Sequence, residues 1–322
     1  MNDNRVVKGS DSLEISFVVP IYNGARMVEA LCARLAPVGC TFGTYEIILV
    51  DDGSRDDSCA VIRQLQQRMP EVCLVQLSRN FGQHNATLAG LAQARGDLII
   101  TLDQDLQHPP EEISSLVEKI NEGFDVVYGL PNKRPHSLFR NLTSDFSKWL
   151  SRKILATALK GNFSSFRAIR SWVVAEVVQY NTSYIYLDGF ISWTTANVGG
   201  VTVQNPKSEF ESQYTFFKLI THGINLLVNF SIRPLQVASI VGFISSFVGF
   251  VLAVFIVINK LFFGEPVQGW TSLIVVVMVL GGAQIAFLGL IGEYIGRILM
   301  NTNRAPNYVI REIRRERPSD AT

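Results

Sequence analysis

Short apolar runs rich in β-branched residues alternate with longer amphipathic stretches over the first 130 residues of the chain. Runs of this kind are typical of strands that are buried on both faces of a parallel sheet. They predict strands at residues 15–20, 45–50, 72–77, 98–102 and 125–128. The stretches between them predict helices at residues 25–36, 57–68, 83–94 and 111–121. This alternation predicts an α/β fold with a doubly wound, mainly parallel sheet.

Two long apolar runs follow in the last third of the chain. Residues 235–258 and 270–292 carry no charged side chain, and each run is long enough to cross a hydrocarbon core of about 30 Å. A pair of buried core helices is the alternative, but such helices seldom stay uncharged for so long. Before the first run, Lys218, His222 and Arg233 are spaced among bulky apolar residues, which predicts an amphipathic helix at the membrane surface. The predicted divisions are a catalytic domain (1–214), an interfacial helix (215–233), two transmembrane helices (234–299) and a basic tail (300–322).

Charge is distributed unevenly around these runs. The net charge is only +1, and no basic stripe with interleaved aromatic residues occurs in the first half, which argues against a nucleic-acid partner. The segment between the two runs offers only Lys260 and Glu265. By the positive-inside rule, the large domain and both termini are expected in the cytoplasm. The arginines that follow the second run are Arg297, Arg304, Arg311, Arg314, Arg315 and Arg317.

The four cysteines show no metal-binding or redox spacing. Cys32, Cys40, Cys59 and Cys73 form no Cys-x-x-Cys pair and have no matching histidine cluster. We therefore expect reduced thiols in a cytosolic domain, and no zinc site.

Polar side chains follow four of the predicted strands at the points where the strands end. These tips are residues 20–23, 51–54, 78–83 and 103–105. Because ligands bind at the carboxyl ends of parallel strands, the tips together predict a nucleotide-binding cleft. It includes Asn23 and Gln83. Each tip alone is compatible with ordinary turn chemistry, since Asp-Gly-Ser is a common loop sequence.

The fourth tip carries the clearest candidate chemistry. Residues 103–107 read Asp-Gln-Asp-Leu-Gln, and residues 109–112 read Pro-Pro-Glu-Glu, which is typical of a helix start. Oxygen ligands suit Mg²⁺ or Mn²⁺, so Asp103, Asp105 and Gln107 are the predicted metal ligands. Two surface acids in a strand-to-helix turn are the alternative interpretation.

No glycine-rich phosphate loop is present in the sequence, so basic side chains are expected to hold a diphosphate. Lys133, Arg134 and Arg140 follow the fifth predicted strand. Arginine suits bidentate phosphate recognition, and lysine supplies a point charge. A solvated helix face is the alternative for each of them.

Residues 18–23 (Val-Val-Pro-Ile-Tyr-Asn), 50–54 (Val-Asp-Asp-Gly-Ser) and 103–112, together with the two apolar runs, resemble glycosyltransferase family 2. The resemblance is to its membrane-anchored polyisoprenyl-phosphate branch, to which residues 288–297 (Leu-Gly-Leu-Ile-Gly-Glu-Tyr-Ile-Gly-Arg) are similar. That branch includes bacterial undecaprenyl-phosphate glycosyltransferases and, more distantly, dolichyl-phosphate mannose synthase. The resemblance implies a GT-A type domain, a place in the bacterial inner membrane and a homotetramer.

The resemblance also implies roles for single residues. Asp52 is expected to face the base, and Asp103 to lie by the ribose and diphosphate. Asp105 and Gln107 would hold Mg²⁺ or Mn²⁺. Nucleoside contacts are expected from Pro20, Tyr22, Asp52 and Ser54, contacts to the donor diphosphate and lipid phosphate from Arg134 and Arg140, and closure over the site from Ser212 and Tyr214.

Three positions depart from the pattern of the family. Gly24 stands where members often have glutamate, and Gln213 stands where they commonly have lysine. Residues 162–167 (Asn-Phe-Ser-Ser-Phe-Arg) lack the acid that many relatives carry there as the expected base. A lipid monophosphate with a second pKa of about 6 needs no base at neutral pH. Asp188 is the fallback base, with a helix cap or turn residue as the alternative.

The predicted reaction moves one sugar from a nucleotide-diphosphate sugar, with a uridine donor favoured, to undecaprenyl phosphate with inversion. The product would be a lipid-linked sugar for envelope glycans such as lipopolysaccharide. A processive polysaccharide synthase is one alternative, but its Gln-x-x-Arg-Trp motif and additional spans are not found in the sequence. An inactive membrane scaffold is the other, and the missing acid near Asn162 is its main support.

Overall fold

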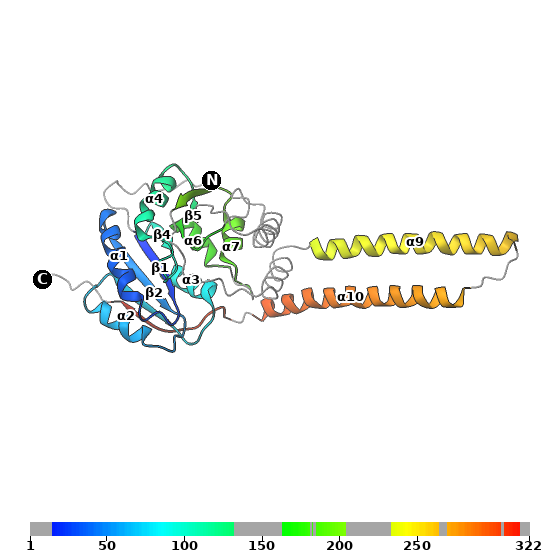
Figure 1. The fold of residues 1–322 in the computed structure, drawn as a ribbon, viewed down its shortest axis with the longest axis horizontal. Helices are drawn as coiled ribbons and strands as arrows, with labels where there is room; N and C mark the ends of the chain where they lie inside the picture. The colour runs from blue at the N-terminus through cyan, green and yellow to red at the C-terminus, as the bar shows by residue number, and fades with distance from the viewer. Residues whose placement is uncertain are drawn as a thin grey trace, which may run out of the picture. The chain divides into compact units, whose positions relative to one another are not determined.

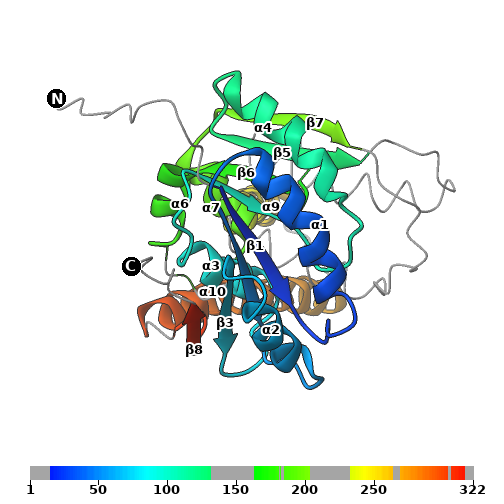
Figure 2. The ribbon, with the colours of Figure 1, turned by 90° about the vertical axis from the view of Figure 1, so that its left-hand side faces the viewer.

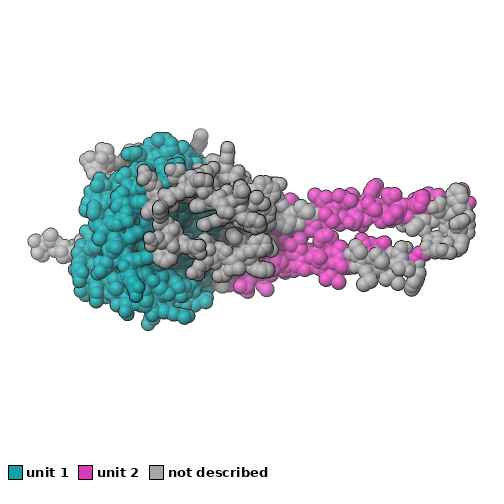
Figure 3. All heavy atoms as spheres, in the orientation of Figure 1, with its two compact units in different colours: residues 1–213, 306–322 teal, residues 214–305 magenta. Residues whose placement is uncertain are grey.

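The computed structural model describes residues 15–131, 163–180, 182, 185–203, 233–263, 269–303 and 306–315. The chain divides into two compact units, residues 1–213 with 306–322 and residues 214–305 (Figure 3). The predicted interfacial helix lies outside the described residues, apart from Arg233.

An eight-stranded sheet forms the centre of the first unit (Figure 1). Its strand order is β7-β5-β6-β4-β1-β2-β3-β8. Only β6 and β8 run antiparallel to their neighbours, and the remaining pairs are parallel. The predicted α/β class with a mainly parallel sheet is therefore confirmed. The strands are β1 (Ile15–Ile21), β2 (Tyr45–Asp51), β3 (Val72–Leu77), β4 (Leu98–Thr101), β5 (Val126–Pro131), β6 (Arg167–Arg170), β7 (Val198–Val203) and β8 (Ile310–Arg315).

Helices cover both faces of this sheet (Figure 2). Successive side chains of a strand point to opposite faces, so Phe17 and Val19 join the core beneath α1 while Val18 faces α3. A Cβ at Gly90 would lie 2.5 Å from Val18 Cγ1, so glycine there allows α3 to pack closely. One face carries α1 (Val28–Thr41), α2 (Ser58–Gln66), η1 (Pro110–Glu112) and α4 (Ile113–Asn121), and the other carries α3 (Gln83–Leu91), α6 (Ser171–Val177) and α7 (Leu187–Thr194).

The second unit contains two long helices, α9 (Arg233–Phe263) and α10 (Trp270–Thr302). Within α10, residues Leu280–Thr302 are long and apolar enough to cross a membrane, whereas the apolar part of α9, Ala238–Leu252, is shorter. Large apolar side chains on α9 are exposed, among them Phe243 and Phe262 at 76% and 77%. Helices this apolar on their surface need a partner or a lipid environment. Two membrane crossings stay a prediction.

Strand β8 is formed by residues that the sequence analysis assigned to a basic tail. It pairs with β3 at the edge of the sheet, with Val75 opposite Ile313. Arg63 and Arg315 form ion pairs with Glu312 and Glu46 at 2.8 and 2.5 Å. The C-terminal segment therefore completes the sheet of the first unit.

Candidate active site

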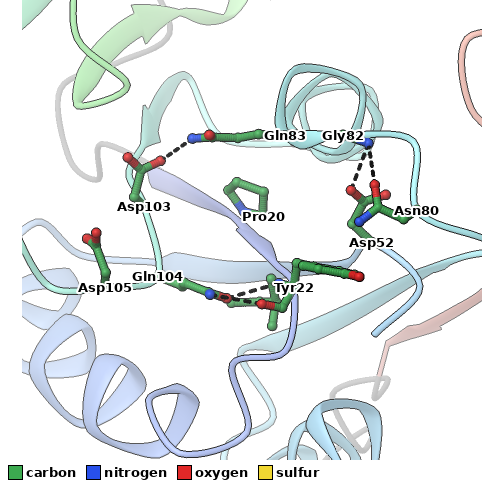
Figure 4. A pocket seen from close by; sticks show the side chains of 10 residues that line it. Pro20, Tyr22, Asp52, Asn80, Gly82, Gln83, Asp103, Gln104 and Asp105 are labelled. Atoms are coloured by element: carbon green, nitrogen blue, oxygen red, sulfur yellow. Dashed lines mark hydrogen bonds between the residues drawn. The ribbon is translucent and has the colours of Figure 1, made fainter. Parts of the chain in front are cut away.

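A cavity of about 370 Å³ lies where the first four strands end (Figure 4). Its volume falls within the range of about 300–1,000 Å³ typical of small-molecule sites. Asp103 and Asp105 lie on one side of it, and Asp52, Asn80 and Gly82 lie on the other. The parallel strands thus bring the four polar tips together. The described lining residues are Pro20, Ile21, Tyr22, Asp52, Asn80, Gly82, Gln83, Asp103, Gln104 and Asp105.

Tyr22 is held at the cavity by the side chain of Gln104. The Tyr22 backbone N–H donates to Gln104 Oε1 at 3.0 Å, and Gln104 Nε2 donates to the Tyr22 carbonyl at 3.1 Å. The Tyr22 side chain stays 39% exposed. A Cβ at Gly24 would lie 2.5 Å from Gln104 Oε1. The Gln104 amide therefore occupies the space beside Gly24.

Asp52 fixes the loop between β3 and α3. Its Oδ1 and Oδ2 accept hydrogen bonds from the backbone N–H groups of Phe81 and Gly82, at 2.7 and 2.9 Å. Burial raises the pKa of the Asp52 carboxyl, and these two N–H groups act in the opposite direction. Gly53 supports the same contact, because its φ is +64° and an added Cβ would lie 2.5 Å from the carbonyl carbon of Arg79.

Asn23 and Ser54 brace the tips of β1 and β2 and do not belong to the described cavity lining. The Asn23 backbone N–H donates to Ser54 Oγ at 3.0 Å, and the Arg55 N–H donates to Asn23 Oδ1 at 2.9 Å. Asn23 has a φ of 51°, a left-handed conformation that asparagine tolerates better than most residues. Their direct contact with a nucleotide stays a prediction.

Asp103 is held through both of its oxygens. Gln83 Nε2 donates to Oδ1 at 2.5 Å, and Ser165 Oγ donates to Oδ2 at 2.6 Å. Burial raises the pKa of the Asp103 carboxyl, and the negative charge of Asp105 acts in the same direction. The Ser165 hydrogen bond and His108 oppose that rise. Two neighbouring carboxylates in this environment favour the approach of a cation.

The donor set fits a hard divalent cation. Asp103 and Asp105 offer carboxylate oxygens to one cavity, and Mg²⁺ is commonly held by one or two carboxylates together with substrate phosphates. Gln107 donates its backbone N–H to Asp105 Oδ1 at 3.1 Å. Gln107 itself is absent from the described lining of the cavity. Among the residues described, no three His, Cys, Asp or Glu side chains form a metal-binding group. Phosphate oxygens and water molecules would complete the coordination.

Asp188 lies in the first turn of α7 and is absent from the described lining of the cavity. It is buried, forms an ion pair with Arg167 and accepts a hydrogen bond from the Tyr128 hydroxyl at 2.9 Å. These contacts bind the carboxylate within the protein interior. Its predicted role as a base stays a prediction.

Several predicted residues lie outside the described part of the chain, and several described ones were missed. Asn80 and Gly82 belong to a tip from which the sequence analysis selected only Gln83. Gln104 lies between two acids that carry the stronger signal, and Ser165 lies in the stretch 162–167, where the family pattern predicts only an acid. The predicted residues outside the described ranges are Lys133, Arg134, Arg140, Asn162, Ser212, Gln213 and Tyr214.

Comparison with known proteins identifies the family. The model of the family described as "Glycosyl transferase family 2" matches residues 16–177. An undecaprenyl-phosphate 4-deoxy-4-formamido-L-arabinose transferase of Photorhabdus laumondii is 36% identical over 306 residues, 93% of this chain and 94% of that protein. The transferase of the same name from Klebsiella pneumoniae strain 342 is 34% identical over 308 residues, 94% of each chain.

Solved structures agree with the fold. Glucosyl-3-phosphoglycerate synthase from Mycobacterium tuberculosis, in complex with Mn²⁺, uridine diphosphate and glucosyl-3-phosphoglycerate, matches with a TM-score of 0.50 and 18% identity. The match covers 67% of this chain and 79% of that one, and it supports the GT-A type fold of the first unit. Since the family model covers about half of the chain and the two transferases are at least 34% identical over nearly all of it, the chain belongs to glycosyl transferase family 2, in its polyisoprenyl-phosphate glycosyltransferase branch.

Proposed function

We propose that this glycosyltransferase moves one sugar from a nucleotide-diphosphate sugar, with a uridine donor favoured, to undecaprenyl phosphate. The observation that carries the proposal is the cavity at the four strand tips, with Asp52 at one side and Asp103 and Asp105 at the other. Such a cavity offers a place for the nucleoside at Asp52 and for the diphosphate at the two acids. The names of the two similar transferases support the lipid acceptor.

The reaction needs positioning more than proton transfer. An oxygen of the lipid phosphate attacks the anomeric carbon, the bond from that carbon to the diphosphate breaks, and the nucleoside diphosphate leaves from the opposite face. The configuration is inverted. Because the second pKa of a phosphate monoester is about 6, the attacking group is largely dianionic at pH 7. Alignment of the two reactants then supplies much of the rate.

Asp103 and Asp105 are the residues proposed to hold Mg²⁺ or Mn²⁺, with Gln107 as a further candidate ligand. Bound there, the cation would offset the charge that develops on the departing diphosphate. Lys133, Arg134 and Arg140 are proposed to gather the two phosphates from outside the described ranges. These assignments rest on the oxygen donor set of the cavity and on the chemistry of the side chains.

The cellular setting is part of the proposal. We place the protein in the bacterial inner membrane, with the catalytic domain and both termini in the cytoplasm, making lipid-linked sugars for envelope glycans such as lipopolysaccharide. The apolar surface of α9 and the candidate span Leu280–Thr302 support a membrane location. A homotetramer is proposed from the family resemblance alone.

A donor panel tests the reaction class. Detergent-purified protein is incubated with undecaprenyl phosphate, Mg²⁺ or Mn²⁺ and one nucleotide sugar at a time, and lipid products are identified by mass spectrometry. We expect one donor to give a lipid-linked sugar and EDTA to abolish its formation. Nucleotide-sugar binding without transfer from any donor would instead support an inactive scaffold.

A further inference from the structure

A charged cluster lies buried beside the cavity, and no step of the proposed sugar transfer uses it. Arg167 on β6 is opposite Thr101 of β4 and Tyr128 of β5 in the strand register. Its guanidinium forms an ion pair with Asp188 of α7, and its Nε donates to Thr101 Oγ1 at 3.0 Å. The Tyr128 hydroxyl donates to the same Asp188 oxygen at 2.9 Å. All four residues are at most 5% exposed.

This cluster is connected to the cavity through Thr101 and Ser165. Thr101 Oγ1 donates to the Ser165 carbonyl at 2.6 Å, and Ser165 Oγ donates to Asp103 Oδ2, also at 2.6 Å. Arg167 thus lies two hydrogen-bonded residues away from the carboxylate proposed to hold a cation. Each connection is a hydrogen bond of ordinary or short length, so a shift of the guanidinium would be transmitted to Asp103.

Stability alone gives little reason to bury this cluster. The desolvation cost of a buried ion pair often equals or exceeds its attraction, and apolar residues of the same volume frequently serve as well. Buried polar groups fix geometry more strictly than apolar packing does. The cluster lies at the carboxyl end of β4, next to the cavity, where strict geometry matters for ligand binding.

We propose that Arg167, held by Asp188 and Tyr128, is a positioning residue that orients the Asp103 carboxylate through Thr101 and Ser165. The inference rests on the proposed function, because it assumes that Asp103 takes part in metal-dependent nucleotide binding. It assigns Asp188 to the same support rather than to proton transfer. Oxygen ligands of metals are commonly oriented by such outer contacts.

Arg170 provides a matched control on the same strand. Its Nε and Nη2 donate to the carbonyls of Phe124 and Ile120, both at 3.0 Å, and Arg170 does not belong to the described lining of the cavity. In Arg167→Lys the charge is retained, but one ammonium group replaces the planar donor set that spans Thr101 and Asp188. Arg170→Lys makes the same chemical change without touching the connection to Asp103.

Calorimetric titration of the full-length protein with UDP at several Mn²⁺ concentrations separates positioning from folding. For Arg167→Lys we expect the affinity for Mn²⁺ and UDP to fall by about 10- to 100-fold, the usual effect of removing an outer contact of a metal ligand. The number of sites per chain should stay at the wild-type value. Partial unfolding would instead reduce the number of sites and leave their affinity unchanged. Arg170→Lys should bind as the wild type does.

Ser165→Ala keeps the test decisive if Arg167→Lys fails to fold. It removes the hydrogen bond from Ser165 to Asp103, which is the final link from Arg167, and leaves the buried ion pair intact. It should also weaken binding at an unchanged number of sites. Wild-type affinity in Ser165→Ala, or equal affinities in the two lysine variants, would overturn the inference about Arg167 and leave the proposed function standing. A wild-type protein that binds no UDP in the presence of Mn²⁺ would overturn the proposed function with it.

Asp188→Asn separates positioning from proton transfer. A positioning role predicts weaker binding of Mn²⁺ and UDP, because the ion pair with Arg167 is lost. If binding stays at the wild-type level while sugar transfer is abolished, Asp188 acts as a base and its assignment here is wrong.

Discussion

Gln104 holds the backbone of Tyr22 through both polar atoms of its side-chain amide, although the two residues are 82 positions apart in the chain. A side-chain amide donates through its NH₂ group and accepts through its carbonyl oxygen, so it can make both bonds at once. Gly24 leaves room for that amide, since its added Cβ would lie 2.5 Å from Gln104 Oε1. Residues 24 and 104 should therefore be energetically coupled.

A double-mutant cycle measures this coupling. Gln104→Ala should lower the free energy of unfolding by about 0.5–1.5 kcal/mol for each hydrogen bond lost, and should weaken nucleotide binding because Tyr22 is no longer held at the cavity. Gly24→Ala in the wild-type background should also weaken binding, because its methyl group displaces the Gln104 amide. In the Gln104→Ala background the same change should cost clearly less. Additive effects on UDP affinity would contradict the steric relation between Gly24 and Gln104.

The thiols provide a second prediction at the residue scale, one that concerns pH. Burial raises the pKa of Cys32 and Cys59 to about 12 and that of Cys73 to about 11, whereas Cys40 is exposed. Because a thiol reacts as the thiolate, the three raised pKa values keep these groups protonated and slow at pH 8, and their rates rise only toward pH 11–12.

Alkylation counted by mass spectrometry tests the thiol assignment. Native protein at pH 8 should take up one label, and denatured protein should take up one on each of its four cysteines. Cys40→Ser should remove the fast native reaction. A second thiol that reacts in the native protein as fast as Cys40 would show that the burial described here is wrong.

The loop between β3 and α3 depends on a glycine from a different strand tip. Gly53 and Gly123 both have positive φ, +64° and +105°, but only Gly53 has backbone atoms of Arg79 and Asn80 within 2.6 Å of an added Cβ. Nothing lies within 4 Å at Gly123. The two glycines therefore separate the cost of backbone conformation from the cost of a steric clash.

Alanine substitution at both glycines tests this difference. Gly123→Ala should cost about 1–2 kcal/mol of unfolding free energy, the usual penalty of a left-handed alanine, and should leave UDP affinity unchanged. Gly53→Ala should cost more and should also weaken UDP binding, because it displaces the loop that carries Asn80 and Gly82. Chemical denaturation and calorimetry measure the two effects. Equal loss of stability with normal UDP binding in both variants would contradict the packing at Gly53.

Local sequence patterns predicted the elements whose apolar residues carry their own signal. β1 to β5 are largely apolar runs, so their place and type were predicted, and parallel topology then predicted which tips meet. β6 reads Arg-Ala-Ile-Arg, β7 reads Val-Gly-Gly-Val-Thr-Val and β8 reads Ile-Arg-Glu-Ile-Arg-Arg. Charged side chains and glycines interrupt the apolar pattern of these strands. Their pairing depends on strands that are distant in the sequence, so a local pattern does not predict them.

The same reasoning applies to the site. Asp103, Asp105 and Asp52 follow strands directly, so a pattern along the chain was enough to select them. Ser165 and Gln104 matter through hydrogen bonds to residues 62 and 82 positions away, and no local pattern encodes such contacts. Asp188 was selected for its chemistry, but its partners Arg167 and Tyr128 could be named only from the structure.

At the scale of the whole molecule, the pairing of β3 with β8 constrains the membrane topology. Both strands belong to one sheet, so the chain leaves the first unit after β7 and returns to it before β8. A chain that crosses a bilayer between these points must cross it an even number of times. If the candidate span Leu280–Thr302 crosses a membrane, we therefore expect a second crossing, and among the described helices α9 is the candidate for it.

Reporter fusions test this topology. Alkaline phosphatase, which is active only outside the cytoplasm, is inserted at residues 264–268 or fused to the C-terminus. We expect an active reporter at the insertion and an inactive one at the C-terminus. Activity at the C-terminus of a protein whose N-terminus is in the cytoplasm would mean an odd number of crossings and would contradict the pairing of β3 with β8 within one chain.

The central claim is that sugar transfer to undecaprenyl phosphate takes place at the cavity formed by the strand tips. Asp105 and Asp97 allow a direct test, because they flank opposite ends of β4 and Asp97 is exposed and remote from the cavity lining. The measurement is the rate of lipid-linked sugar formation, followed by mass spectrometry, in the wild type, Asp105→Ala and Asp97→Ala. We predict that Asp105→Ala abolishes transfer while Asp97→Ala retains the wild-type rate. Wild-type transfer by Asp105→Ala would contradict the assignment of this cavity as the active site.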